Sequence, residues 1–182
     1  RKRDQCAGLA QVFIYGATVN ARASAVAQGN TLARTLTLLP PNELSPATYQ
    51  TQLQALAQNY GWQWQAWDLP TLHHLGAGAF CAVTQADPSI GSGIVKLSYR
   101  HPAATQTVAL VGKGVCFDTG GYHLKSARHM WQMHEDMNGS AVALGALVAA
   151  TELHLPVNVD VWLALAENHL SPRAYLPNMV VR

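Results

Sequence analysis

Residues 139–154 limit most strongly how this chain can fold, because they read as a helix that is apolar on almost every face. Such a helix has no side suited to water, so we expect other parts of the protein to cover it on both sides. Pro156 ends the helix, and the run from Val157 to Ala166 then reads as a buried central strand. This segment therefore predicts the interior of a layered domain.

Helices and strands alternate along the rest of the chain. Helices are expected over 19–38, from the N-cap Ser45 to about Tyr60 with Gly61 at its end, and over 69–75. Strands are expected over 62–67, 79–84, 93–99 and 106–112. This alternation is typical of an α/β domain, so we predict a mostly parallel central sheet flanked by helices. Residues 1–18 are expected to form a leading linker, and residues 19–182 one domain.

The composition excludes several classes of protein. Apolar residues make up 49% of the chain and charged residues only 12%, with a net charge of +2, which excludes a disordered chain and a nucleic-acid binder that works through a basic face. No apolar run is long enough to predict a membrane span. The three cysteines show neither a disulfide framework nor a metal knuckle, which favours the cytoplasm. So little charge predicts that much of the surface faces another domain or subunit.

Ionisable residues concentrate in the segment 112–136. The whole chain has only four lysines and six aspartates, and two of each fall here: Lys113, Asp118, Lys125 and Asp136. Two aspartates in an apolar site repel each other unless lysines or divalent metals neutralise them. At the end of a core strand, an apolar wall disfavours the ammonium form of Lys113, and a neutral amine can ligate a metal. The pattern fits both a structural ion-pair network and a metal or catalytic site.

Longer motifs surround these four residues. The run from Val111 to Lys125, the run from Met130 to Ala141, Ala166-Glu167-Asn168 and the stretch 172–177 closely resemble the leucyl aminopeptidases, also called cytosol aminopeptidases. Upstream, residues 30–34 and 40–46 are similar to the helix and turn that lead into the catalytic domain of that family. The resemblance extends from residue 20 to the end.

The resemblance implies an exopeptidase that releases N-terminal amino acids from peptides with the help of two divalent ions, Mn²⁺ or Zn²⁺. Lys113, Asp118 and Asp136 would be metal ligands, and Lys125 would be the catalytic lysine. Met133 falls where the family lines the pocket for the first side chain of the substrate. The resemblance also implies a homo-hexamer.

One part of the family pattern is missing from the 182 residues. The family has a downstream Asn-Thr-Asp-Ala-Glu-Gly-Arg block, which supplies two further metal ligands and a catalytic arginine. We therefore expect this chain to be an incomplete part of the catalytic domain and to be inactive alone.

Other interpretations of the same residues are weaker. A degenerate copy would serve as a structural or DNA-associated assembly subunit, but such a copy has no physical reason to keep costly buried charges. The glycines around Lys113 form neither of the common nucleotide-binding patterns. His123 or His134 would at most add a ligand or a proton relay. Cys116 lacks the His–Asn pattern of a cysteine nucleophile.

Overall fold

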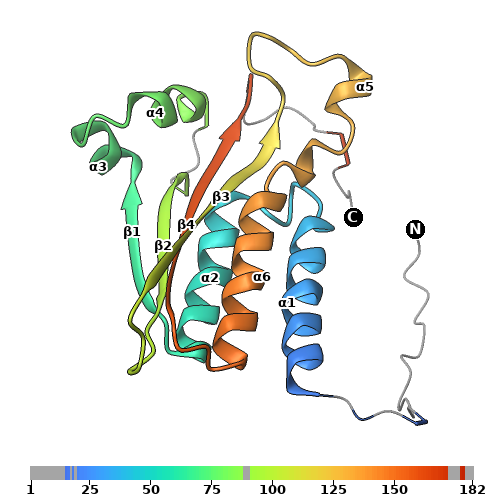
Figure 1. Cartoon of the computed structure of the whole chain (residues 1–182). Helices are drawn as coiled ribbons and strands as arrows, with labels where there is room; N and C mark the ends of the chain where they lie inside the picture. Colours follow the sequence, from blue (N-terminus) through green and yellow to red (C-terminus); the bar gives the residue numbers. More distant parts are fainter. Residues whose placement is uncertain (1–14, 17, 19, 88–90, 172–176, 179–182) are drawn as a thin grey trace.

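The computed structural model describes residues 15–16, 18, 20–87, 91–171 and 177–178. Most of the expected linker 1–18 lies outside these residues, as does the family-like stretch 172–176. The described chain forms a four-stranded sheet with helices packed on one face and shorter helices beyond one end (Figure 1).

The strand order in the sheet is β1-β2-β4-β3. These strands span Gln63–Asp68 (β1), Gly93–Tyr99 (β2), Thr107–Asp118 (β3) and Asn158–Asn168 (β4). The pairs β1–β2 and β2–β4 are antiparallel, and the pair β3–β4 is parallel. The sheet is therefore mixed, and the prediction of a mostly parallel sheet is right only for β3 and β4.

The connections between strands explain these directions. The helices α3 (Leu69–His74) and α4 (Gly78–Thr84) join β1 to β2 beyond one end of the sheet, so the chain turns back without crossing it (Figure 1). In contrast, α6 (Asn138–Glu152) runs back along the sheet between β3 and β4, and this crossover makes the two strands parallel.

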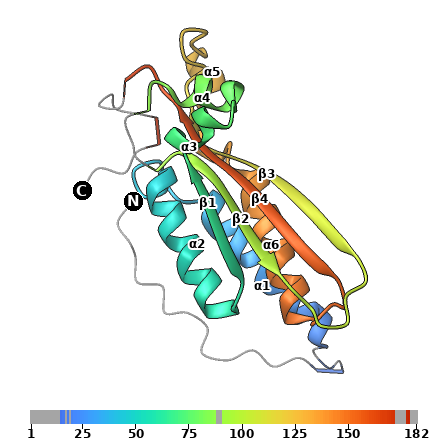
Figure 2. The same ribbon diagram turned by 90° about the vertical axis from the view of Figure 1, so that its left-hand side faces the viewer.

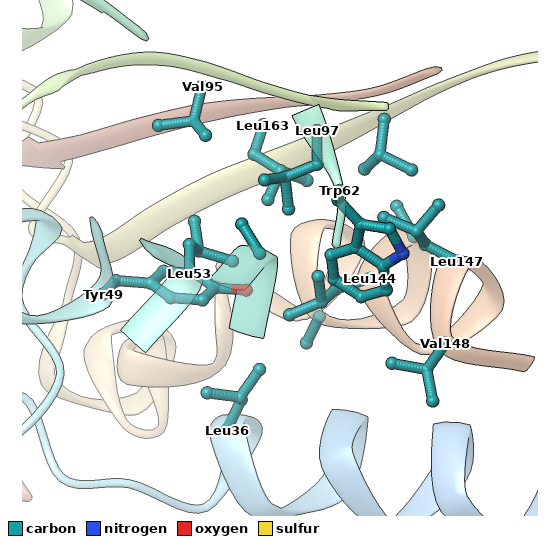
Figure 3. Close-up of a cluster of buried hydrophobic side chains, with 14 of the residues drawn as sticks. Leu36, Tyr49, Leu53, Trp62, Val95, Leu97, Leu144, Leu147, Val148 and Leu163 are labelled. Atoms are coloured by element: carbon teal, nitrogen blue, oxygen red, sulfur yellow. The ribbon is translucent and has the colours of Figure 1, made fainter. Parts of the chain in front are cut away.

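Two long helices, α2 (Pro46–Tyr60) and α6, pack on one face of the sheet, and a third, α1 (Ala21–Thr37), packs against α6 (Figure 2). The apolar core lies between them and the strands (Figure 3). Its fully buried side chains include Leu53 of α2, Leu97 of β2, Leu144 of α6 and Leu163 of β4. In the described part of the chain, no helix is both long and apolar enough to cross a membrane.

The apolar helix predicted over 139–154 is confirmed as α6, and it is covered from two sides. One side packs on the sheet, and the other packs against α1. The crossing with α1 is close because glycines face each other: a Cβ on Gly145 would lie 2.5 Å from the backbone oxygen of Gly29. The two backbones touch, and any larger side chain would separate the helices.

Two other predictions fare differently. The helix that begins after Ser45 is confirmed with its caps: Ser45 and Thr48 form a reciprocal capping box, and Gly61 ends the helix with a left-handed φ of 67°. The strand predicted over 79–84 is wrong, because this short apolar run forms α4. A run of five apolar residues does not distinguish a strand from a short helix.

Candidate functional site

The candidate site lies where β3 meets the start of α6. Lys113 and Asp118 belong to β3, and Asp136 comes two residues before α6. The helix start packs directly on the strand, since a Cβ on Gly112 would lie 2.5 Å from the Cα of Ser140. Two glycines therefore bring the backbone just after Asp136 next to Lys113: Gly112 on the strand and Gly139 on the helix.

The position of Lys113 differs from the sequence-based expectation. The strand does not end at residue 112 but continues to Asp118, so Lys113 lies within it. Its side chain is 58% exposed rather than set in an apolar wall. The reason is the strand order: among the described strands, β3 is at the edge of the sheet, and no other strand covers its outer side.

Lys113 and Asp136 form the first of two ion pairs. The Nζ atom of Lys113 lies 2.9 Å from Oδ2 of Asp136, whose side chain is 22% exposed. This Oδ2 atom is shielded from solvent and makes no regular hydrogen bond with any residue that the structure describes. A shielded carboxylate oxygen that faces only an ammonium group has remaining capacity to accept a further donor or a cation.

Lys125 and Asp118 form the second ion pair, with 2.5 Å between Nζ and Oδ2. The other oxygen of Asp118, Oδ1, accepts hydrogen bonds from the backbone N–H of Gly120 at 2.9 Å and from Nδ2 of Asn168 at 2.8 Å. Burial by itself would raise the pKa of Asp118. The bonds from Lys125, Gly120 and Asn168 outweigh burial and hold this pKa below its usual value, so the carboxylate stays ionised.

A tight loop brings Lys125 back to Asp118. Gly120 and Gly121 both adopt left-handed backbone angles, with φ of 86° and 63°. The backbone N–H of Lys125 donates to the oxygen of Thr119 at 3.0 Å and closes the loop. The two glycines are thus the residues that let a lysine seven positions after Asp118 pair with it.

Met133 connects the two ion pairs. Its sulfur lies 3.0 Å from Nζ of Lys125, and its backbone oxygen accepts a hydrogen bond from the N–H of Asp136 at 3.4 Å. It opens the short 3-10 helix η1 (Met133–Glu135), which packs on β3. All five residues singled out from the sequence therefore lie in one connected region of the fold.

A second polar cluster is buried beside this region, at the end of β4. Burial and the nearby Asp87 raise the pKa of Glu167 to about 8. The ring nitrogen Nε2 of His169 lies 3.3 Å from Oε2 of Glu167, and burial lowers the pKa of His169. Ser92 donates a hydrogen bond of 2.5 Å to Asp87. Burial thus favours the neutral forms of Glu167 and His169.

The remaining candidates are peripheral to the ion pairs. His123 is exposed on the loop. His134 is half-buried, and burial lowers its pKa. Cys116 is buried, and burial raises the pKa of its thiol well above the usual value, which is the opposite of what a nucleophilic cysteine needs.

The donor set of the site fits a hard divalent cation in part. Within the described ranges, no three Asp, Glu, His or Cys side chains come together in a way that could hold a metal ion. Two carboxylates and the amine of Lys113 are present, and the shielded Oδ2 of Asp136 fits a cation ligand. Sequence reasoning assigned no role to Asn168; its place at the end of a buried strand was the available signal.

Comparisons with known proteins point to the family that the motifs around these residues resemble. Residues 31–182 match the catalytic domain of the cytosol aminopeptidase family. A probable cytosol aminopeptidase of Streptomyces coelicolor is 44% identical over 161 residues, which are 88% of this chain and 31% of that protein. One of Leifsonia xyli subsp. xyli is 41% identical over 167 residues, which are 92% of this chain and 34% of that protein. The chain thus spans about a third of the length of the curated relatives that it matches.

Solved structures give the same result. A leucyl aminopeptidase from Trypanosoma brucei in complex with bestatin superposes with a TM-score of 0.80 and 32% identity, over 87% of this chain and 31% of that one. The bottromycin maturation enzyme BotP in complex with Mn superposes with a TM-score of 0.76 and 34% identity, over 85% of this chain and 33% of that one. The chain therefore belongs to the cytosol aminopeptidase family.

Proposed function

We propose that this chain contributes the lysine and aspartate part of a two-metal aminopeptidase site, and that residues 19–182 are the N-terminal part of its catalytic domain. The observation that carries the proposal is the pairing of two lysines with two aspartates, Lys113–Asp136 and Lys125–Asp118, beside the start of α6. The family match over 31–182 supports the reaction class.

Each side chain then has a stated task. Asp118, Asp136 and Lys113, once its ammonium group has released a proton, would hold divalent ions, Mn²⁺ or Zn²⁺, and the Mn complex of BotP supports this choice. Bound ions of this kind supply Lewis-acid chemistry for hydrolysis of a peptide bond. Lys125 lies beside Asp118 and would stabilise negative charge that develops on the carbonyl oxygen of the substrate. Met133 would present an apolar side chain to the first residue of the peptide.

The donor count also bears on activity. Two carboxylates and one amine do not fill the coordination shells of two divalent ions, which take four to six ligands or more each. We infer that further ligands come from sequence outside these 182 residues, and that the chain alone releases no N-terminal amino acid. For the whole protein we infer peptide substrates, a homo-hexameric assembly and a cytoplasmic location, in line with the names of its relatives.

Titration of the 182-residue chain with Mn²⁺, followed by the electron paramagnetic resonance signal of free Mn²⁺, tests the proposal. Weak binding is expected in the parent chain and loss of it in Asp118→Ala and in Asp136→Ala. Asp160→Ala is the matched control, because Asp160 is also paired with cations, Lys96 and Arg100, but on another part of the sheet.

The outcomes are distinct. Equal Mn²⁺ affinity in the parent and in both site variants would contradict the proposed ligands, and so would an equal loss in Asp160→Ala. Release of p-nitroaniline from a leucyl substrate by the chain alone would contradict the inferred need for further ligands.

A further inference from the structure

Asn168 contacts Asp118 directly and is linked to Lys125 through Thr119. It ends β4 and stands opposite Asp118 in the parallel register. Its Nδ2 donates to Oδ1 of Asp118, and its backbone oxygen accepts two hydrogen bonds from Thr119, from N at 2.9 Å and from Oγ1 at 2.8 Å. Thr119 in turn accepts the N–H of Lys125.

The surroundings fix the orientation of the Asn168 amide. The Oδ1 atom of Asp118 also accepts the backbone N–H of Gly120, so it is an acceptor toward Asn168 and the NH₂ group faces it. The amide oxygen Oδ1 points to the other side, where a Cβ on Gly121 would lie 3.1 Å away. Gly121 therefore leaves room for the amide, and the asparagine is held at its side chain and at its backbone.

We propose that Asn168 is a positioning residue for Asp118 and for the loop that carries Lys125. With Oδ1 held by two N–H donors, the carboxylate of Asp118 has little freedom to rotate, and Oδ2 stays directed at the site. Partners that orient a ligand side chain affect metal affinity through it without touching the metal. This inference rests on the proposed function, because it assigns Asn168 a task toward a proposed metal ligand.

The first test compares Mn²⁺ affinity between variants of the 182-residue chain. Asn168→Ala is expected to weaken Mn²⁺ binding about 10-fold, and Asn168→Gln, which keeps an amide donor, to recover part of the loss. Asn158→Ala is the matched control: this asparagine lies at the other end of β4, and its Oδ1 accepts a hydrogen bond from the N–H of His101 at 3.1 Å. The Asn158→Ala chain loses a comparable hydrogen bond and is expected to keep the Mn²⁺ affinity of the parent chain.

The second test needs no metal. Nuclear magnetic resonance of the metal-free chain reports the side-chain amide protons of Asn168, which Asp118→Ala is expected to shift and Asp136→Ala to leave in place.

Two results would overturn the inference. One is a loss of Mn²⁺ affinity in Asn168→Ala no larger than in Asn158→Ala. The other is an Asn168 amide signal that does not respond to Asp118→Ala. Absence of Mn²⁺ binding in the parent chain would instead refute the proposed ligand set, and the amide signals would still decide whether Asn168 holds Asp118.

Discussion

Replacing Glu167 with glutamine should flatten the pH dependence of the free energy of unfolding between about pH 4.5 and pH 8. Burial and the nearby Asp87 raise the pKa of Glu167 from 4.5 to about 8 in the folded chain, whereas the unfolded chain exposes it to water. Over this range the folded state keeps the proton and the unfolded state releases it. The stabilisation from this proton is therefore complete below pH 4.5 and is lost as the pH rises to about 8.

The size of the effect follows from the shift. A rise from 4.5 to about 8 corresponds to about 5 kcal/mol at 1.36 kcal/mol per unit. Water penetration and local relaxation reduce the penalty of a buried charge, so we expect about 2–3 kcal/mol. For a chain of this length, that difference amounts to about 4–12 °C in Tm.

Urea unfolding at a series of pH values measures this effect. The parent chain should lose stability relative to Glu167→Gln as the pH rises. Glu152→Gln, at the exposed end of α6, is the control and should follow the parent curve. His169 contributes with the opposite sign, since its lowered pKa gives a stabilisation that is present above its usual pKa and lost on acidification. Parallel curves for the parent and Glu167→Gln would refute the reasoning and show that Glu167 is ionised in the folded chain.

Two further substitutions test the packing and capping described above. Gly145→Ala should destabilise the chain by about 1–3 kcal/mol in urea unfolding, because the new methyl group would meet the backbone oxygen of Gly29. Gly78→Ala is the control, because the space around its new methyl group is open. Equal destabilisation in the two variants would contradict the close crossing of α1 and α6. Ser45→Ala should cost about 1 kcal/mol, because it removes the cap on the N–H of Thr48, and an unchanged unfolding midpoint would argue against that cap.

The sequence predicted individual elements well where several local signals agreed. The helix α6 combines an all-apolar composition with Pro156 just beyond its end, and α2 combines a serine cap with a terminal glycine. The run over 79–84 has neither type of signal, and it was predicted as a strand but forms a helix. Strand direction depends on where the connections lie in space, which no local pattern contains. For that reason the antiparallel pairs of β2 were not foreseen.

The candidate site, too, could be predicted from the sequence only in part. The concentration of lysine and aspartate within 112–136 is visible in the sequence, and it selected the residues that the structure brings together. Which lysine pairs with which aspartate depends on the turn at Gly120 and Gly121. Asn168 is 50 residues away from Asp118 in the sequence, and only the parallel register of β3 and β4 makes them neighbours.

The two ion pairs have a consequence for how this protein reaches its native state. Each of the two aspartates already has a lysine partner: Asp136 pairs with Lys113, and Asp118 pairs with Lys125. Repulsion between the two carboxylates therefore does not destabilise the folded chain. In proteins whose ligands stay unmatched until a cation arrives, metal uptake and chain folding are a single event. The proposed ligands of this chain are matched by its own lysines, so we expect its folding not to depend on the supply of ions.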